Sequence, residues 1–257
     1  MALRRAVVYA LFLAGCGRIG FPTGGDDITG DGGPTGDAAS GDSGPLLDCT
    51  MTYPGARFCS TFEEPDMGGW DYTVLDEGTA ALSTARAYRG VQSLEIRTTG
   101  ADAYKSARWG KNYVFDEVAV GDIYIRGYYW IESSTVVTDQ LSIMVTGNAD
   151  PPYPSANVML VPGGMHSNVD GENVSAAFEF PRDRWTCLLM HLVVGANGSL
   201  EVFVDATRVL SRTGFDTRVA GGYTNVDEGV HYATPAQAPA HFYVDEVVVD
   251  TSPVTCD

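Results

Sequence analysis

The stretch Gly121–Ser133 has the sequence GDIYIRGYYWIES, and its residues alternate between two kinds of side chain. Successive side chains of a β-strand point to opposite faces of a sheet, so this alternation predicts a strand with one apolar face in a core. The residues expected on the core face are Ile123, Ile125, Tyr129 and Ile131. The residues expected on the opposite side, called the aromatic face below, are Tyr124, Arg126, Tyr128, Trp130 and Glu132.

The aromatic face has two interpretations. In the first, Tyr128 and Trp130 stack on the apolar patches of sugar rings, while Arg126 and Glu132 orient the sugar through charge-assisted hydrogen bonds. In the second, the rings fill the other side of a core or lie under a loop. The sequence leaves both interpretations open.

Similar short runs rich in Val, Ile, Tyr, Phe and Thr recur along the chain between Gly, Asn, Asp and Pro residues. This pattern is typical of strands separated by turns, and Asn197-Gly198 is typical of a hairpin tip. No segment shows a convincing apolar stripe with a helical period, so the chain is predicted to be all-β, an antiparallel sandwich or barrel. The clearest predicted strands are Ser93–Arg97, Ile123–Glu132, Leu141–Val145, Val158–Val161, Ala176–Phe180, Trp185–Val194, Leu200–Val204 and His241–Asp250.

Three segments bracket nearly the whole body of the chain: CSTFEE at 59–64, RDRWTCLLMHLVVGANGSLEVFVDATRVL at 182–210, and HFYVDEVVVDTSPVTC at 241–256. In this order they resemble the opening strand, the Trp-led strand with its tight hairpin, and the closing strand of the concanavalin A-like lectin/glucanase and laminin-G-like superfamily. The resemblance implies an antiparallel jelly-roll β-sandwich over residues 49–257.

That superfamily contains lectins, carbohydrate-binding modules, glycoside hydrolases and polysaccharide lyases, so the fold does not decide the function. A retaining hydrolase needs two carboxylates about 5–5.5 Å apart, but the E-x-D-x-E run of the hydrolases and the Q-I-H strand of alginate lyases are missing. The adjacent acidic pairs Asp116-Glu117, Asp227-Glu228 and Asp245-Glu246 would point to opposite faces of a strand. We therefore expect non-catalytic carbohydrate binding by the aromatic face on a concave sheet. A hydrolase or lyase with a divergent site, or a protein-interaction domain, are the alternatives.

Two histidines lie in informative surroundings. The strand around His191 is apolar on both faces, which predicts a central strand and a packed or hydrogen-bonded histidine rather than a catalytic base. His166 lies in PGGMHSNVDGEN at 162–173, which we predict to be a loop that could border a cleft.

The first residues, MALRRAVVYALFLAGC, have the layout of a secretory signal, with an apolar run too short to span a bilayer. Leu13-Ala14-Gly15-Cys16 resembles the lipobox of bacterial lipoproteins, in which the signal is removed before a Cys that then carries acyl chains. The resemblance implies a signal peptide over 1–15 and a lipidated Cys16 that attaches the chain to a lipid bilayer. Gly17 stands where an Asp would favour inner-membrane retention, so we expect the outer membrane, facing the periplasm or the cell surface. An ordinary signal peptide with a chance Cys is the alternative.

Residues 16–48 are rich in Gly, Asp, Ser, Thr and Pro, which predicts a flexible linker between Cys16 and the domain at 49–257. The whole chain has 33 acidic and 16 basic residues, a formal net charge of −17. Such an acidic chain is not expected to bind nucleic acid, and it would be repelled by anionic lipid head groups or anionic polymers.

The four cysteines other than Cys16 are predicted to form two disulfides in an oxidising compartment, with three pairings possible. Cys49 and Cys59 flank a Pro-Gly turn signal, which favours a local Cys49–Cys59 bond. Cys187 and Cys256 would then join an inner strand to the C-terminus.

The superfamily resemblance also implies a structural calcium ion. In many members an acidic residue near the first strand and an Asp on the last strand hold Ca²⁺ together with backbone carbonyls. Glu63 or Glu64 and Asp245 occupy comparable positions here, and carboxylates are suitable calcium ligands. The alternative is that these residues are solvated acids on edge strands.

Overall fold

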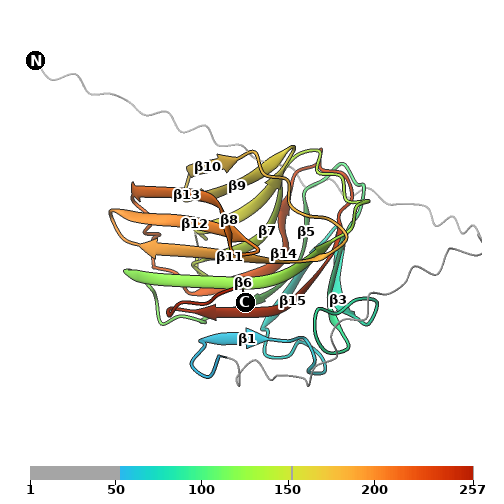
Figure 1. The fold of residues 1–257 in the computed structure, drawn as a ribbon, viewed down its shortest axis with the longest axis horizontal. Coiled ribbons are helices and arrows are strands. Elements are labelled where there is room, and N and C mark those ends of the chain that lie inside the picture. The colour runs from blue at the N-terminus through green and yellow to red at the C-terminus, as the bar shows by residue number, and fades with distance from the viewer. Residues whose placement is uncertain (1–52, 152, 257) are drawn as a thin grey trace, which may run out of the picture. The chain divides into compact units, whose positions relative to one another are not determined.

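The computed structural model describes residues 53–151 and 153–256, and all the regular elements in these ranges are β-strands (Figure 1). The strands form two antiparallel sheets. Sheet A has the order β13 (Thr207–Phe215), β12 (Gly198–Val204), β11 (Trp185–Val194), β6 (Gly121–Ile131), β15 (His241–Asp250), β4 (Ser93–Thr98) and β3 (Gly78–Ser83), and β1 (Phe58–Ser60) pairs with β15. Sheet B has the order β10 (Glu172–Ala176), β9 (Gly164–Val169), β8 (Ser155–Val161), β7 (Leu141–Gly147), β14 (Asn225–Ala233), β5 (Lys105–Lys111) and β2 (Tyr72–Asp76).

The core lies between the sheets and takes alternate residues from each strand. The four residues predicted for the core face of β6 are all fully buried in this cluster: Ile123, Ile125, Tyr129 and Ile131. From sheet B, Trp109 on β5 and Val158 on β8 belong to the same cluster. The predicted division of β6 into a core face and an outer face is therefore confirmed.

Two of the predicted strands, β11 and β15, have the bounds expected from the sequence. The predicted strand Ala176–Phe180 is wrong, because β10 ends at Ala176 and Phe180 packs in the core against Tyr129 without belonging to a strand. A short apolar run that covers a core edge has the same pattern as a buried strand. The loop predicted at 162–173 is instead the hairpin of β9 and β10, whose turn uses Asp170 and Gly171 with positive φ.

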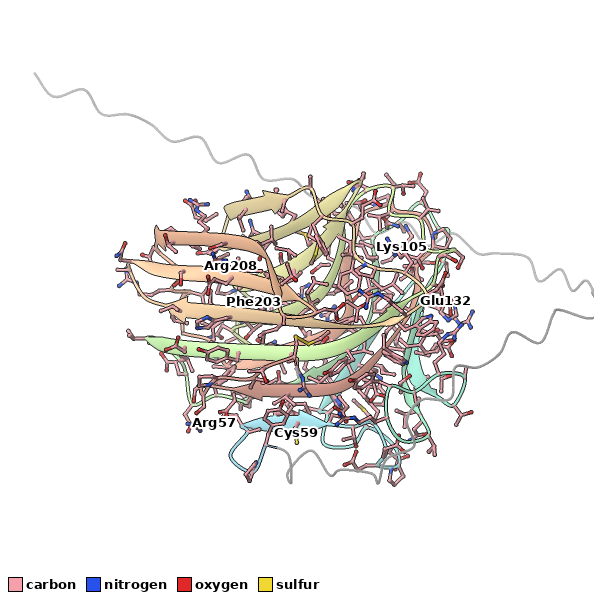
Figure 2. The ribbon with its side chains drawn as sticks, in the orientation of Figure 1. Arg57, Cys59, Lys105, Glu132, Phe203 and Arg208 are labelled. Carbon is pink, nitrogen blue, oxygen red and sulfur yellow. A yellow bond between two sulfur atoms is a disulfide. The ribbon has the colours of Figure 1, made fainter. Side chains whose placement is uncertain are left out.

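The C-terminal segment is fixed to sheet A by the predicted disulfide between Cys187 on β11 and Cys256. Cys59, labelled in Figure 2, lies on β1 beside β15. It is also disulfide-bonded. Its predicted partner Cys49 lies outside the described residues, as do the signal peptide, Cys16 and the linker, so this disulfide, the signal peptide, the lipidation and the linker stay predictions. In the ranges that the structure covers, no helix is long and apolar enough to cross a membrane.

Candidate functional site

The aromatic face of β6 lies on the outer side of sheet A, where Arg126 is buried under both ends of the described chain. The Arg126 guanidinium donates to the Tyr53 hydroxyl at 2.7 Å and to the Thr255 carbonyl at 3.2 Å. It also donates to the Glu246 backbone carbonyl at 3.3 Å, and it lies 3.6 Å from the Glu246 carboxylate. With only 2% of its surface exposed, Arg126 cannot contact a sugar in this arrangement.

Tyr128 lies under the segment between β3 and β4. Its ring stacks on Tyr88, with 3.7 Å between ring centroids and 12° between planes. The buried carboxylate of Asp245, on the neighbouring strand β15, accepts the backbone N–H groups of Tyr88 at 2.7 Å and Arg89 at 3.3 Å. Asp245 therefore holds this segment over the Tyr128 ring.

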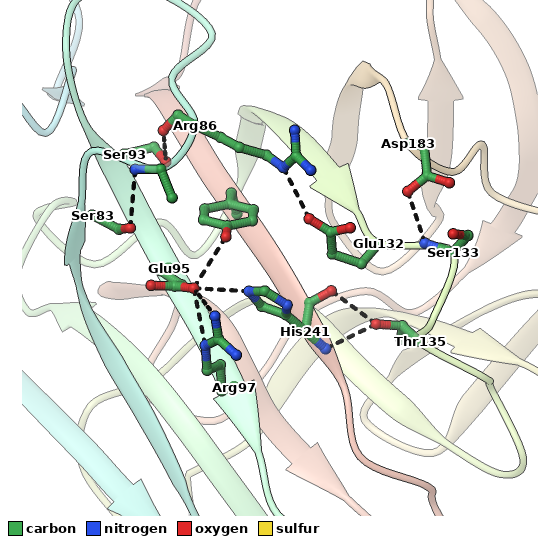
Figure 3. A network of polar contacts seen from close by, with 12 residues as sticks. Ser83, Arg86, Ser93, Glu95, Arg97, Glu132, Ser133, Thr135, Asp183 and His241 are labelled. Carbon is green, nitrogen blue, oxygen red and sulfur yellow. Dashed lines mark hydrogen bonds and ion pairs between the residues drawn. The ribbon is translucent and has the colours of Figure 1, made fainter. Parts of the chain in front are cut away.

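The remaining side chains of the aromatic face also have partners within the chain. The Arg86 guanidinium lies 4.2 Å from the ring centroid of Trp130 and donates to Glu132 at 2.9 Å (Figure 3). The Tyr124 ring stacks on His191, with centroids 4.2 Å apart. Figure 3 shows a second network on the same face, in which Glu95 accepts hydrogen bonds from Arg97, His241 and Tyr243.

These contacts match the interpretation in which the aromatic face lies under other segments of the chain. The five residues lie together on one face, as expected, but other residues of the chain contact and cover them.

The carboxylates expected to bind calcium are also occupied. Glu63 accepts the N–H groups of Val91 at 2.8 Å and Gln92 at 3.0 Å, while Asp245 holds the segment described above. A calcium ion between these carboxylates would need further oxygen ligands around it, whereas the groups that face both carboxylates are N–H donors. Among the described side chains, no group of three or more His, Cys, Asp or Glu residues could hold a metal ion. The arrangement does not fit a calcium site at Glu63 and Asp245. A site that uses Glu64 in place of Glu63 stays a prediction that chelation can test.

The outer face of sheet B contains a cavity of about 430 Å³. Its floor is formed by β2, β5, β14 and β7, and its rim by the loop between β7 and β8. The side chains that matter for its chemistry are Tyr72, Arg108, Tyr153, Asn225, Asp227 and His231.

Tyr72 and Asp227 form the centre of the cavity floor. The strand register aligns Tyr72 with Gly110 and Gly110 with Asp227, so the tyrosine and the carboxylate meet across the glycine. The Tyr72 hydroxyl donates to Asp227 Oδ1. A Cβ at Gly110 would lie 2.0 Å from the Tyr72 ring and 2.4 Å from Asp227 Oδ1, so only glycine leaves room for this hydrogen bond.

Arg108 and His231 approach the other oxygen of the same carboxylate. Asp227 Oδ2 lies 3.6 Å from Arg108 Nε and 3.5 Å from His231 Nε2. The Arg108 guanidinium also donates to the Ser106 hydroxyl and to the His231 carbonyl. A phenol, a guanidinium and an imidazole thus surround one buried carboxylate, and the phenol is hydrogen-bonded to it.

Burial determines the protonation states in this cavity. It raises the pKa of Tyr72, and the charge of Asp227 raises it further, so the phenol keeps its proton at neutral pH. Burial, followed by the charge of Arg108, lowers the pKa of His231 to about 4, so the imidazole is neutral. Burial also raises the pKa of Asp227 above its ordinary value, against the opposing effects of Arg108 and Tyr72.

Two polar atoms of the cavity residues lack hydrogen-bond partners. Arg108 Nε and Asn225 Oδ1 are buried, and neither makes a hydrogen bond in the described structure. A buried polar atom without a partner costs about 1–3 kcal/mol, and both of these atoms belong to residues that line the cavity.

The next residue on β14, Glu228, points to the opposite side of the sheet. It is fully buried in the core and accepts a hydrogen bond from the Tyr129 hydroxyl. The sequence had assigned Asp227 and Glu228 to opposite faces, and this is confirmed. Tyr72, Arg108 and His231 were missed, because their strands were not among those predicted. One signal in the sequence could have identified β5. Its polar or small residues Ser106, Arg108 and Gly110 alternate with the apolar residues Ala107 and Trp109.

No family model matches this sequence, and no curated protein matches it significantly. Solved structures do resemble it. The cellulose-induced protein Cip1 has a TM-score of 0.61 at 13% identity, covering 78% of this chain and 100% of that one. The endo-β-1,4-glucuronan lyase from the fungus Trichoderma reesei has a TM-score of 0.62 at 14% identity, covering 77% of this chain and 96% of that one.

The globular domain of T. cruzi calreticulin has a lower TM-score of 0.52 at 12% identity, covering 77% of this chain and 88% of that one. The fold is a jelly-roll β-sandwich. This confirms the fold class expected from the sequence. At such low identities the likeness concerns the fold alone.

Proposed function

We propose that this chain binds a polysaccharide in the cavity on the outer face of sheet B. The observation that carries the proposal is that Arg108 Nε and Asn225 Oδ1, both buried without hydrogen-bond partners, belong to residues lining an open cavity of about 430 Å³. Sugar hydroxyls both donate and accept hydrogen bonds, so a sugar can pair with the polar groups that these residues present to the cavity. Concave sites with a few convergent polar groups are the usual form of ligand sites.

An exposed aromatic ring at the cavity rim supports the proposal. Tyr153, in the loop between β7 and β8, is 64% exposed and lines the cavity. An aromatic face beside polar groups suits a sugar ring, which has an apolar face and a polar edge. Two of the structures with this fold are named for a glucuronan and for cellulose, both polysaccharides.

The proposal includes attachment to a membrane. The lipobox-like sequence ending at Cys16 supports a lipid anchor, and the polar linker to residue 48 would let the domain reach away from the bilayer. On this proposal the protein is an outer-membrane lipoprotein that holds a polysaccharide near the cell envelope.

Calorimetric titration of the purified full chain with cellulose, glucuronan and alginate oligosaccharides tests the binding. We expect saturable binding to at least one series, weakened about tenfold by Tyr153→Ala. The matched control is Tyr113→Ala, because Tyr113 is equally exposed but does not line this cavity. Lack of binding to all three series, or equal loss in both variants, would contradict the proposal.

A second candidate function, polysaccharide lysis by β-elimination, is favoured by the contacts around Asp227. A neutral His231 can take the C5 proton of a uronic acid, while the protonated Tyr72 gives its proton to the leaving O4. The C4–O4 bond then breaks and a C4–C5 double bond forms, while Arg108 pairs with the sugar carboxylate. Asp227 lies beside all three groups, and no second carboxylate of the described cavity lining is available for a two-carboxylate hydrolase.

The two candidates differ in their products. A lyase releases unsaturated ends that absorb ultraviolet light, and Tyr72→Phe should abolish this signal while keeping the ring. Binding without any new absorbance, in both the wild type and Tyr72→Phe, would support the non-catalytic function and exclude lysis.

A further inference from the structure

The outer face of sheet B continues beyond the cavity as a row of polar side chains toward the edge strand β10. The register aligns Asp227 with Val145 on β7, and Val145 with Asn157 on β8. Asn157 is aligned in turn with Asn168 on β9, and Asn168 with Asn173 on β10. Since residues paired directly across strands share a face, these three asparagines, called the amide row below, extend the cavity floor.

The amide row is long enough to contact sugars that lie beyond the cavity. Neighbouring strands lie about 4.8 Å apart, so three spacings from β7 to β10 extend roughly 14 Å beyond the cavity. Asn157 and Asn168 are half-buried, while Asn173 is exposed. The row runs across the strands, as an extended chain leaving the cavity in that direction would.

Hydrogen bonds between the side chains fix their orientation. Asn173 Oδ1 accepts from Asn168 Nδ2 at 2.6 Å and contacts His166 Nε2 at 2.9 Å. His166 Nδ1 lies 2.8 Å from the Ser175 hydroxyl. Because a carbonyl oxygen only accepts, His166 carries its proton on Nε2, and Nδ1 accepts from Ser175.

The edge strand is also held in place. Arg212 on β13 donates to the Asn173 carbonyl at 2.9 Å and to the Glu172 carboxylate at 2.6 Å. This links the edge strands of the two sheets. A surface whose side chains and backbone are fixed in advance loses less entropy when a ligand binds.

We infer that the amide row is a second binding surface for the same polysaccharide and takes its uncharged, hydroxyl-bearing sugars. This inference rests on the proposed function, because the row continues the floor of the proposed site. Each primary amide already bonds within the chain, but it has two N–H donors and donates at most one of them, so each keeps an N–H for a sugar hydroxyl. The row itself carries no charged side chain to pair with a sugar carboxylate. The cavity with Arg108 and the row thus recognise different parts of one chain.

The test compares short and long ligands. Oligosaccharides of three and eight sugars, from the cellulose, glucuronan and alginate series, are titrated calorimetrically against the full chain. The test variant is His166→Ala with Asn173→Ala. Asn168 and Asn173 both bond to Gly171 in the hairpin turn, so Asn168 is kept and the melting temperature of the variant is measured. Asn197→Ala, in the exposed turn between β11 and β12, is the matched control.

In the wild type and the control, the eight-sugar ligand should bind more tightly than the three-sugar ligand. The double variant should bind the three-sugar ligand normally and lose about tenfold affinity for the eight-sugar ligand. If its melting temperature falls, Asn157→Ala replaces it and should give the same selective loss.

Equal affinities of variant and control for the long ligand would overturn the inference while leaving the cavity as a site. Failure of the wild type to bind any ligand in the three series would overturn the proposed function, and the inference with it.

Discussion

The outer faces of the two sheets carry similar residues, but the residues on sheet A are covered by other segments of the chain and those on sheet B line an open cavity. On sheet A, Arg126, Tyr128 and Trp130 contact the terminal segments and the segment before β4. On sheet B, Arg108 and Tyr72 surround a cavity that the chain leaves open. The difference shows that aromatic and charged residues on one strand do not by themselves indicate a binding site. What matters is whether the chain itself supplies their partners.

Buried polar atoms without hydrogen-bond partners occur on both faces, so a missing partner does not by itself identify a ligand site. Arg126 Nε and Trp130 Nε1 lack hydrogen bonds, as Arg108 Nε does. Arg126, however, lies under Tyr53 and the C-terminal segment, where a ligand cannot reach it. Arg108 lines a cavity and its side chain is 16% exposed, so a ligand in the cavity can reach part of this residue.

The largest expected effect is the loss of stability in Arg126→Ala. Removing the guanidinium leaves the nearly buried Glu246 carboxylate with only the more exposed Arg89, at 3.5 Å, as a close cation. Breaking a buried pair typically costs 3–5 kcal/mol, so we expect a loss of about 3 kcal/mol. Arg208→Ala is the control, because Arg208 is exposed and pairs with Glu201 at the surface, where a pair contributes about 0–1 kcal/mol. Denaturant unfolding of both variants measures the difference. Equal stabilities would mean that the outer face of sheet A is not structural.

The two neighbouring acids of β14 allow a prediction about pH. Burial raises the pKa of Glu228 to about 8, so the folded state prefers the protonated acid. The stability that it contributes is fully present below the unfolded pKa of about 4.5 and is lost as the pH rises toward 8. A pKa difference of one corresponds to about 1.4 kcal/mol, so Glu228→Gln should stabilise the chain by a few kcal/mol at pH 8 and have little effect at pH 4.5. A stability difference that does not change with pH would contradict the buried, protonated Glu228.

The contrast between the sheets also explains what the sequence could predict. In sheet A, β6, β11 and β15 have long apolar faces, so their existence followed from simple alternation. In sheet B, β5 has only Ala107 and Trp109 as apolar residues, and the irregular register of β14 interrupts its alternation. These are the strands that carry Arg108, Asp227 and His231. A site on a polar sheet face weakens the pattern that reveals the strand, which is why the fold was predicted and the cavity was not.

The sequence also did not predict that other segments cover the aromatic face, and the reason is different. The contacts of Arg126 with Tyr53 and Thr255 join residues far apart in the sequence. Alternation within a strand fixes which face a side chain points to, as it did for Ile125 and Arg126. It contains no information on which distant segment covers that face.

The smallest expected effect is that of removing calcium. Since Glu63 and Asp245 accept backbone N–H groups, adding EDTA to a calcium-loaded sample should leave the melting temperature unchanged. A lower melting temperature, restored by calcium, would mean that these carboxylates bind the ion and that the segment before β4 rearranges around it.

The most direct test compares Tyr153→Ala on the sheet B side with Trp130→Ala on sheet A, measuring by calorimetry the affinity for whichever oligosaccharide the wild type binds. Tyr153 is 64% exposed at the cavity rim, so its loss should weaken binding about tenfold while the melting temperature stays the same. Trp130 contacts Arg86 within the chain, so its loss should lower the melting temperature and leave the affinity within about twofold of wild type. The reverse result, with affinity lost in Trp130→Ala and kept in Tyr153→Ala, would place the binding site on sheet A and contradict this account.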